Sequence, residues 1–194
     1  SRRDQDEYAL KSHQKSIAAH ENGYYKEEIV PIHVDGEVID VDEGMRKDTS
    51  MKKLSKLPPV FRSDGTVTAG NSSQIADGAA VTMITSAEFA EKNGLDILAS
   101  IESHAVAGVD PKLMGIGPIY STKKMLARTG GEISDFGLVE LNEAFASQCI
   151  HCQRVLEIPE KVFNLKGGAI AIGHPLGATG ARLPVTLIHE MKRQ

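Results

Sequence analysis

The sequence predicts an α/β fold with a largely parallel or mixed sheet. From about residue 78 onward, short apolar segments alternate with stretches of helical length. Such alternation is typical of helices layered on a sheet. Two of the apolar segments are followed by a polar residue and then by a helical stretch, at Asn142 and at His174. Ligands of open α/β sheets bind at the carboxyl ends of the strands, so both residues are expected to face one crevice.

The first element expected is an amphipathic helix over residues 3–22. Asp4 or Asp6 lies near its start and Gly23 lies just beyond its end, which are typical helix boundary signals. Tyr8 and several alanines supply an apolar side. The opposite side is expected to be polar and carries Gln5, Lys11, His13 and Lys15.

A hairpin and an irregular excursion are expected next. The segments Glu28–Val34 and Glu37–Val41 flank Asp35-Gly36, a dipeptide that favours a tight turn between two strands. Residues 43–66 are polar, basic and interrupted by two prolines. They predict an excursion with one short helix, Met51–Leu57.

The rest of the chain supplies the alternating elements of the predicted layer. Strands are expected at Ala79–Thr85, Ile97–Ala107, Leu138–Leu141 and Gly168–Ile172. Helices are expected at 86–94, 118–129, 143–156 and about 180–192. The change of character divides the chain into two predicted domains, 1–75 and 76–194.

Composition narrows the class of protein without identifying a function. The 194 residues are 41% hydrophobic and 25% charged, which is ordinary for a globular domain. A net charge of −4 argues against nucleic-acid binding, which usually needs a basic excess. No apolar run approaches the roughly 18 residues that span a bilayer. The charged start is unlike a signal peptide, and two cysteines fit a reducing cytosol, so a cytoplasmic protein is expected.

A glycine-rich segment, Gly167–Arg182, is the strongest indication of a site. It places His174 between a glycine and a proline, in a turn that leads into a predicted helix. A lone histidine is more often a surface or core residue than a catalyst, but this setting favours function. The glycine spacing fits neither Gly-x-x-x-x-Gly-Lys-Ser/Thr nor Gly-x-Gly-x-x-Gly, which excludes a P-loop or a Rossmann site.

The same segment resembles the thiolases, the acetyl-CoA acetyltransferases and 3-ketoacyl-CoA thiolases. Four further motifs match this family in order and spacing: Ser1–Asp6, Val67–Ser73, Gly108–Gly115 and Asn142–Phe145. The resemblance implies part of a loop domain followed by a C-terminal βαβαβ-type layer. Thiolases use a nucleophilic cysteine upstream of the matched region and an acid/base cysteine in a downstream Cys-x-Gly-Gly loop. The chain therefore resembles an interior piece, with a fold incomplete at both ends.

The resemblance gives His174 and Asn142 catalytic roles. The matching histidine activates the nucleophile and donates to the thioester oxygen, and a neutral imidazole can do both because one nitrogen accepts and the other donates. The matching asparagine holds a water that completes the oxyanion hole. The alternative for Asn142 is a helix N-cap, and both roles can hold together. Glu143 is expected only to favour the helix start electrostatically.

The resemblance also implies residues that bind coenzyme A. The loop around Ser73 would otherwise be an ordinary turn, and a basic run such as this is usually a solvated face. Positive charge would nevertheless attract the phosphates of coenzyme A, although the family does not consistently have lysine at Lys53. The implied residues are Arg46, Lys53, Leu57, Phe61, Ala69, Ser73, Met114 and Phe145.

Cys149 and Cys152 are not expected to be catalytic. Their spacing suggests a redox pair or half of a zinc site, but a complete site needs four ligands. Phe145, Cys149, Cys152 and Leu156 recur at helical spacing, so the thiols are expected to face the core. No metal site is predicted.

The expected parent is a coenzyme A-dependent acyltransferase that condenses two acetyl-CoA molecules or runs the thiolytic reverse. Acyl-CoA is its substrate, with no tightly bound cofactor, and a dimer or tetramer is expected. Without the nucleophile, the isolated chain is expected to be inactive. A thiolase for longer 3-ketoacyl-CoAs and a non-catalytic module that binds coenzyme A or a partner stay open. Similar enzymes have narrow acyl pockets at Met114 and Phe145, which favours the short-chain form.

Overall fold

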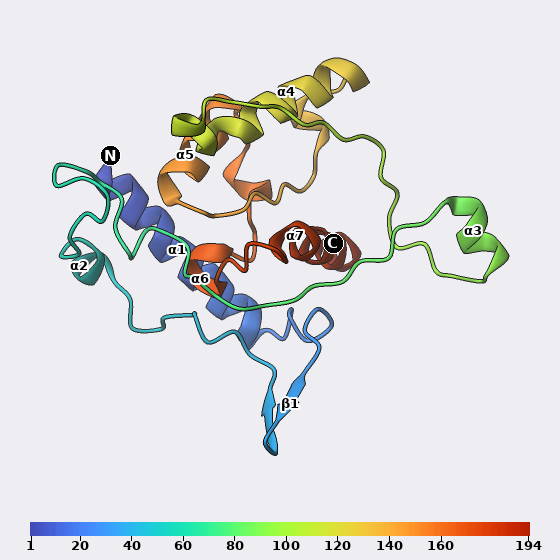
Figure 1. The fold of residues 1–194 in the computed structure, drawn as a ribbon, viewed down its shortest axis with the longest axis horizontal. Helices are drawn as coiled ribbons and strands as arrows, with labels where there is room; N and C mark the ends of the chain where they lie inside the picture. Colours follow the sequence, from blue (N-terminus) through green and yellow to red (C-terminus); the bar gives the residue numbers. More distant parts are fainter.

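The computed structural model describes residues 1–194 and is mainly helical (Figure 1). The long helix α1 (Arg2–Glu21) contacts both α5 (Ala146–Val155) and the short α6 (Ala169–Ile172). Helix α7 (Thr179–Arg193) follows α6 after a tight turn, and α4 (Gly117–Thr129) packs against α5. These helices surround the segments that carry the candidate site residues.

The remaining elements are short. Helix α3 stands apart from the other helices, at the end of two extended segments (Figure 1). No helix is long and apolar enough to cross a membrane. The short elements are β1 (Ile32–Val34), β2 (Glu37–Ile39), α2 (Met51–Leu54), α3 (Ala87–Lys92) and the 3-10 helices η1 (Pro111–Ile116), η2 (Ile133–Asp135) and η3 (Glu160–Val162).

The predicted first helix is confirmed, but its buried face is small and polar rather than apolar. Ser1, not Asp4 or Asp6, is the N-cap residue. Gln5 and His13, expected on the polar outer side, are only 7% and 3% exposed. The reason is that both side chains face other segments of the chain: Gln5 Nε2 donates to Thr66 Oγ1 at 3.0 Å, and His13 Nδ1 accepts from the Arg46 backbone N–H at 3.2 Å.

The predicted hairpin is confirmed with shorter strands. β1 and β2 pair antiparallel, and the turn between them has positive φ at both Asp35 (50°) and Gly36 (86°). This geometry matches the right-handed twist of the two strands. All six strand residues are exposed, and the hairpin projects from the molecule (Figure 1). The short helix predicted after it is also confirmed, but it ends at Leu54 rather than at Leu57.

The four predicted strands of the second domain are wrong for this chain. The only sheet is the hairpin. Ala79–Thr85 and Ile97–Ala107 have no regular structure, because no other strand pairs with their backbones. Leu138–Leu141 forms a single parallel bridge, between Val139 and Phe163. Most of the Gly168–Ile172 segment is helix α6, since a short apolar run does not by itself distinguish a strand from a buried helix.

The four predicted helices of this region are confirmed as α3, α4, α5 and α7. The largest apolar cluster lies where α4, α5 and the segment after α5 meet. It contains Cys149 and Cys152, both fully buried, so the prediction that the two thiols face the core is confirmed. Its buried members are Ile119, Cys149, Cys152, Leu156, Ile158 and Phe163.

Candidate functional site

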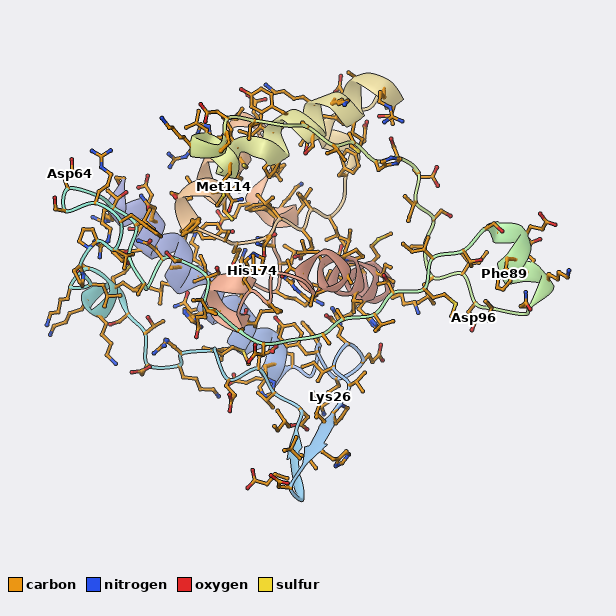
Figure 2. All side chains as sticks on the ribbon, viewed as in Figure 1. Lys26, Asp64, Phe89, Asp96, Met114 and His174 are labelled. Atoms are coloured by element: carbon orange, nitrogen blue, oxygen red, sulfur yellow. The ribbon has the colours of Figure 1, made fainter.

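Three loop segments, 68–74, 142–145 and 173–179, meet beside the N-terminus of α5. Backbone hydrogen bonds join them: Ser73 N donates to Ala144 O at 2.9 Å, and His174 N donates to Gln74 O at 3.0 Å. Segments far apart in the sequence are therefore held at one place by their main chains. Figure 2 shows His174 near the middle of the molecule.

The side chains of His174 and Asn142 touch. Asn142 Nδ2 lies 3.3 Å from His174 Nε2, within hydrogen-bond distance. The Asn142 backbone carbonyl accepts from Cys149 Sγ at 3.5 Å, so α5 helps to hold the residue in place. Asn142 Oδ1 is buried and has no hydrogen-bond partner. A buried amide oxygen of this kind is able to accept a hydrogen bond from water or ligand.

The alternative role of Asn142 as a helix N-cap is wrong. Helix α5 begins at Ala146, and Phe145 occupies the N-cap position. The reason is that residues 142–145 are not helical, and Phe145 is extended and forms an antiparallel bridge with Ser72. The Asn142 side chain is thus left to face His174.

The turn that carries His174 is held from several directions. Gly173 has φ of 94°, and a Cβ at this position would lie 2.6 Å from the Ala76 Cβ, so only glycine fits. His174 Nδ1 lies 2.7 Å from Thr179 Oγ1, at the start of α7. Partial burial and the positive charge of Arg182 lower the pKa of His174, which favours a neutral imidazole.

Glu143, next to Asn142, is completely enclosed and anchors this segment to α1 and α6. Its carboxylate accepts from Ser12 Oγ at 2.6 Å, Tyr8 OH at 3.1 Å, Ile170 N at 3.2 Å and Asn164 Nδ2 at 3.3 Å. Burial raises the pKa of Glu143, and these hydrogen bonds oppose that rise. The expectation of a merely electrostatic role at the helix start is wrong, because the side chain turns inward instead.

Sequence reasoning missed two residues that shape the site, Thr179 and Gln74, and the structural role of a third, Glu143. Gln74 Nε2 donates to Gly44 O at 2.8 Å and to Ile170 O at 3.1 Å, which ties the loop before α2 to α6. All three lie inside the matching motifs or next to them. Their importance depends on tertiary contacts, so motif membership is the only signal that could have found them.

Some of the residues expected to bind coenzyme A lie at this site. Ser73 bonds to Ala144, as described above, and Phe145 packs edge-on against Phe61 with ring centroids 6.0 Å apart. Phe61 is 71% exposed, so the pair forms an open apolar surface beside the loop.

The other expected residues are spread over several segments. Lys53 is paired with Asp48 at 2.5 Å, and the Arg46 side chain is exposed. Met114 is 64% exposed on η1, which packs against α5 (Figure 2). Leu57 is half-buried and Ala69 is exposed. The structure thus groups Ser73, Phe61 and Phe145 with the His174–Asn142 pair. Ala69 lies in the segment 68–74, Leu57 packs against Gly70 of that segment, and the other three lie on different segments.

Both cysteines are free and buried, and burial raises the pKa of each thiol. Cys152 Sγ donates to Gly115 O at 3.4 Å. A raised pKa leaves little thiolate, which is the reactive form. No group of three or more His, Cys, Asp or Glu side chains is placed to hold a metal ion.

Comparison with known families identifies the chain's class. The family described as Thiolase, N-terminal domain matches residues 1–88, and Thiolase, C-terminal domain matches residues 95–194. The chain belongs to the thiolase family. Its fold class is therefore the α/β fold of thiolases, although the sheet predicted for its second half is not formed here.

Individual thiolases match over the whole chain. The peroxisomal 3-ketoacyl CoA thiolase 1 of Petunia hybrida is 48% identical over 100% of this chain and 44% of its own length. The crystal structure of the Bacillus anthracis acetyl-CoA acetyltransferase gives a TM-score of 0.96 at 45% identity, over 100% of this chain and 50% of that one. The crystal structure of human mitochondrial 3-ketoacyl-CoA thiolase in complex with CoA gives a TM-score of 0.91 at 41% identity, over 100% of this chain and 49% of that one. The chain spans about half the length of these thiolases.

Proposed function

We propose that this chain is the thioester-binding part of a coenzyme A-dependent acyltransferase, with His174 and Asn142 as its catalytic residues. The observation that carries the proposal is their 3.3 Å contact together with the buried, unpartnered Oδ1 of Asn142. The carbonyl oxygen of a thioester becomes negatively charged when a nucleophile attacks it. Donors fixed in advance around that oxygen stabilise the transition state.

The two residues suit this task in different ways. A lowered pKa keeps the His174 imidazole neutral, so it is able to take a proton from an attacking thiol. A water that donates one hydrogen to Asn142 Oδ1 has its second hydrogen free for the thioester oxygen. The partnerless oxygen therefore supports the role in holding water that the resemblance implies.

Replacing Asn142 with alanine tests the proposed oxyanion role in the complete enzyme. Loss of one such donor typically lowers turnover by about 100-fold to 1,000-fold. We expect a fall of this order in steady-state thiolysis of acetoacetyl-CoA. Asn22→Ala, a change at the solvent-exposed end of α1, is the matched control and should leave the rate unchanged. An Asn142→Ala enzyme with normal turnover would remove the basis of the proposal.

The chain by itself is not expected to turn over substrate. Covalent acyl transfer in thiolases needs a cysteine thiolate, and both cysteines here are in the core with raised pKa values. Purified chain, free of host enzyme, is therefore expected to show no thiolysis of acetoacetyl-CoA with added coenzyme A. Turnover that disappears in His174→Ala would contradict this expectation, whereas turnover unaffected by that change would reveal a contaminant.

Coenzyme A binding without catalysis is a second candidate function, favoured by the exposed basic side chains and by the Ser73 loop, whose backbone is fixed by a hydrogen bond to Ala144. Arg46 is expected to contribute more than Lys53, whose charge is already paired with Asp48. Calorimetry at millimolar coenzyme A tests this with Arg46→Ala and, as a control distant in sequence, Lys192→Ala. Heat lost only in Arg46→Ala supports binding through this loop. No heat from the wild-type chain counts against it.

The acyl group is proposed to be short, as in acetyl-CoA and acetoacetyl-CoA. The support is the aromatic contact of Phe61 with Phe145 beside the site, and the alternative is a thiolase for longer 3-ketoacyl-CoAs. Comparing acetoacetyl-CoA with 3-ketooctanoyl-CoA and 3-ketohexadecanoyl-CoA on the complete enzyme distinguishes the two. A preference for either longer substrate would overturn the short-chain proposal. The domain division near residue 75 and the oligomeric enzyme both stay predictions.

A further inference from the structure

The contact between His174 and Thr179 involves one ring nitrogen of the imidazole, Nδ1. Thr179 is 5% exposed, and its Oγ1 lies 2.7 Å from His174 Nδ1. The same oxygen lies 3.0 Å from the backbone carbonyl oxygen of Pro175, to which it donates. A threonine hydroxyl has one hydrogen and two lone pairs.

The donation from the Thr179 hydroxyl to Pro175 O is the premise from which the positions of the other hydrogens follow. The hydroxyl hydrogen is used on Pro175 O, which accepts only, so Thr179 Oγ1 is able only to accept from His174. Nδ1 must then carry the imidazole hydrogen. Nε2 is left with its lone pair, which accepts from Asn142 Nδ2 at 3.3 Å. The hydrogen bond on one ring nitrogen thereby sets the state of the other.

We propose that Thr179 is a positioning residue that holds His174 in the Nδ1–H tautomer, so that Nε2 alone performs both of its tasks. This inference rests on the proposed function. In the first task Nε2 takes the proton of an attacking thiol: the S–H bond breaks, an N–H bond forms, and the sulfur keeps the electron pair. In the second task the new Nε2–H donates to the thioester oxygen as that oxygen gains charge.

This arrangement replaces the expectation that the two nitrogens divide the work. Nδ1 points to α7 and is occupied by Thr179, so it does not reach a substrate on the Asn142 side. The hydroxyl is also an uncharged acceptor. It fixes the tautomer without the negative charge of a carboxylate, which would favour a permanently protonated imidazole. The nearby charge of Arg182 acts in the same direction, towards the neutral ring.

The tautomer is measurable in the chain as it stands. Histidine labelled with ¹⁵N gives different multiple-bond ¹H–¹⁵N correlations for a protonated and an unprotonated ring nitrogen, and His174→Gln identifies the signals of residue 174. We expect Nδ1 to be protonated in the wild type and in Thr179→Ser, which keeps the hydroxyl. Thr179→Val keeps the shape without the hydroxyl and should shift the population towards Nε2–H.

The valine variant is expected to fold. Pro175 O also accepts the backbone N–H groups of Ala178 at 2.9 Å and Thr179 at 3.0 Å, so it keeps partners when the hydroxyl is removed. A wild-type spectrum with Nε2 protonated would overturn the proposal. The same tautomer in Thr179→Val as in the wild type would overturn it too.

An activity measurement on the complete enzyme separates this inference from the proposed function. Thr179→Val is expected to lower kcat by roughly 10-fold or more with little change in KM. The loss should stay below the about 10,000-fold loss that follows when a buried carboxylate behind a catalytic histidine is replaced. Thr179→Ser should recover most of the rate. Unchanged kcat in a valine variant with the altered tautomer would refute the positioning role. A wild-type enzyme without acyl transfer would refute the proposed function but leave the tautomer assignment intact.

Discussion

Two carboxyl side chains three residues apart, Glu140 and Glu143, have opposite surroundings. Glu143 accepts four hydrogen bonds, from Tyr8, Ser12, Asn164 and Ile170. Glu140 is largely buried, and that burial raises its pKa to about 7, with the charges of Arg182 and Lys166 opposing the rise. A buried carboxylate with hydrogen-bond donors stabilises a fold, whereas one without them favours its neutral form.

Replacing Glu143 with glutamine should destabilise the chain. Glutamine replaces one carboxylate oxygen with an NH₂ group. Each of the two oxygens accepts from two donors, for example Ser12 Oγ and Ile170 N at Oε2, so in either orientation the NH₂ group faces two donors. Unsatisfied buried groups cost about 1–3 kcal/mol. Urea unfolding at pH 8 measures the difference in the free energy of unfolding between the two proteins. The dependence of that free energy on urea concentration, the m-value, should be the same for both. A variant as stable as the wild type would show that the four contacts do not hold this region together.

Replacing Glu140 with glutamine should have the opposite effect at the same pH. The folded-state pKa of about 7 is above the ordinary glutamate pKa of 4.5, so at pH values between the two the folded chain keeps a proton that the unfolded chain has lost. Stability therefore falls as the pH rises from about 4.5 to 7, by up to about 3 kcal/mol. Glu140→Gln should remove this contribution and be more stable than the wild type at pH 8. If the difference in the free energy of unfolding between wild type and Glu140→Gln is the same at pH 5 and pH 8, the raised pKa of Glu140 is contradicted.

Helices and the local hairpin were predictable from this sequence, whereas strands that would need a distant partner were not. Periodicity and boundary residues gave α1, α3, α4 and α7 to within a few residues, because a helix satisfies its backbone within its own segment. A strand needs a neighbour, and the segments 79–85 and 97–107 have none. The residues of the site likewise fall into those that the sequence could indicate and those that it could not. A motif indicated His174 and Asn142, but the role of Thr179 depends on a hydroxyl whose two contacts exist only after folding.

The approach of Glu143 to α6 explains a glycine at the start of that helix. A Cβ at Gly168 would lie 2.7 Å from Glu143 Cδ and 2.9 Å from its Cγ. Gly168→Ala should therefore cost about 1–3 kcal/mol through overpacking. Gly180, inside α7, has open space around its Cα, so Gly180→Ala should stabilise by up to about 1 kcal/mol. Thermal unfolding of both variants, each compared with the wild type, tests the two predictions. Equal effects would mean that backbone freedom, not the contact with Glu143, determines the cost at Gly168.

At the scale of the whole molecule, the apolar side chains are unevenly covered. The buried clusters lie among α1, α4, α5 and α6, while many large apolar residues are on the surface. Two extended segments, 75–84 and 97–106, carry most of the side chains that are at least two-thirds exposed. These are Ile75 (104%), Val81 (88%), Met83 (78%), Ile84 (74%), Ile101 (70%) and Val106 (78%). Unpaired backbone beside exposed apolar side chains favours association between chains.

The isolated chain is therefore expected to associate and to bind a hydrophobic dye. Light scattering across a dilution series should give a mass above that of the monomer, with dye fluorescence well above that of a compact control protein. A Val81→Asp and Ile84→Asp double variant places charge on the first segment and should lower both signals, since charges on exposed strands oppose edge-to-edge pairing. Lys123→Asp and Lys192→Asp, which change charge on α4 and α7 without removing apolar surface, form the matched control and should leave the dye signal unchanged. A monomeric wild type without dye binding would show that these two segments are covered in solution, contrary to the structure.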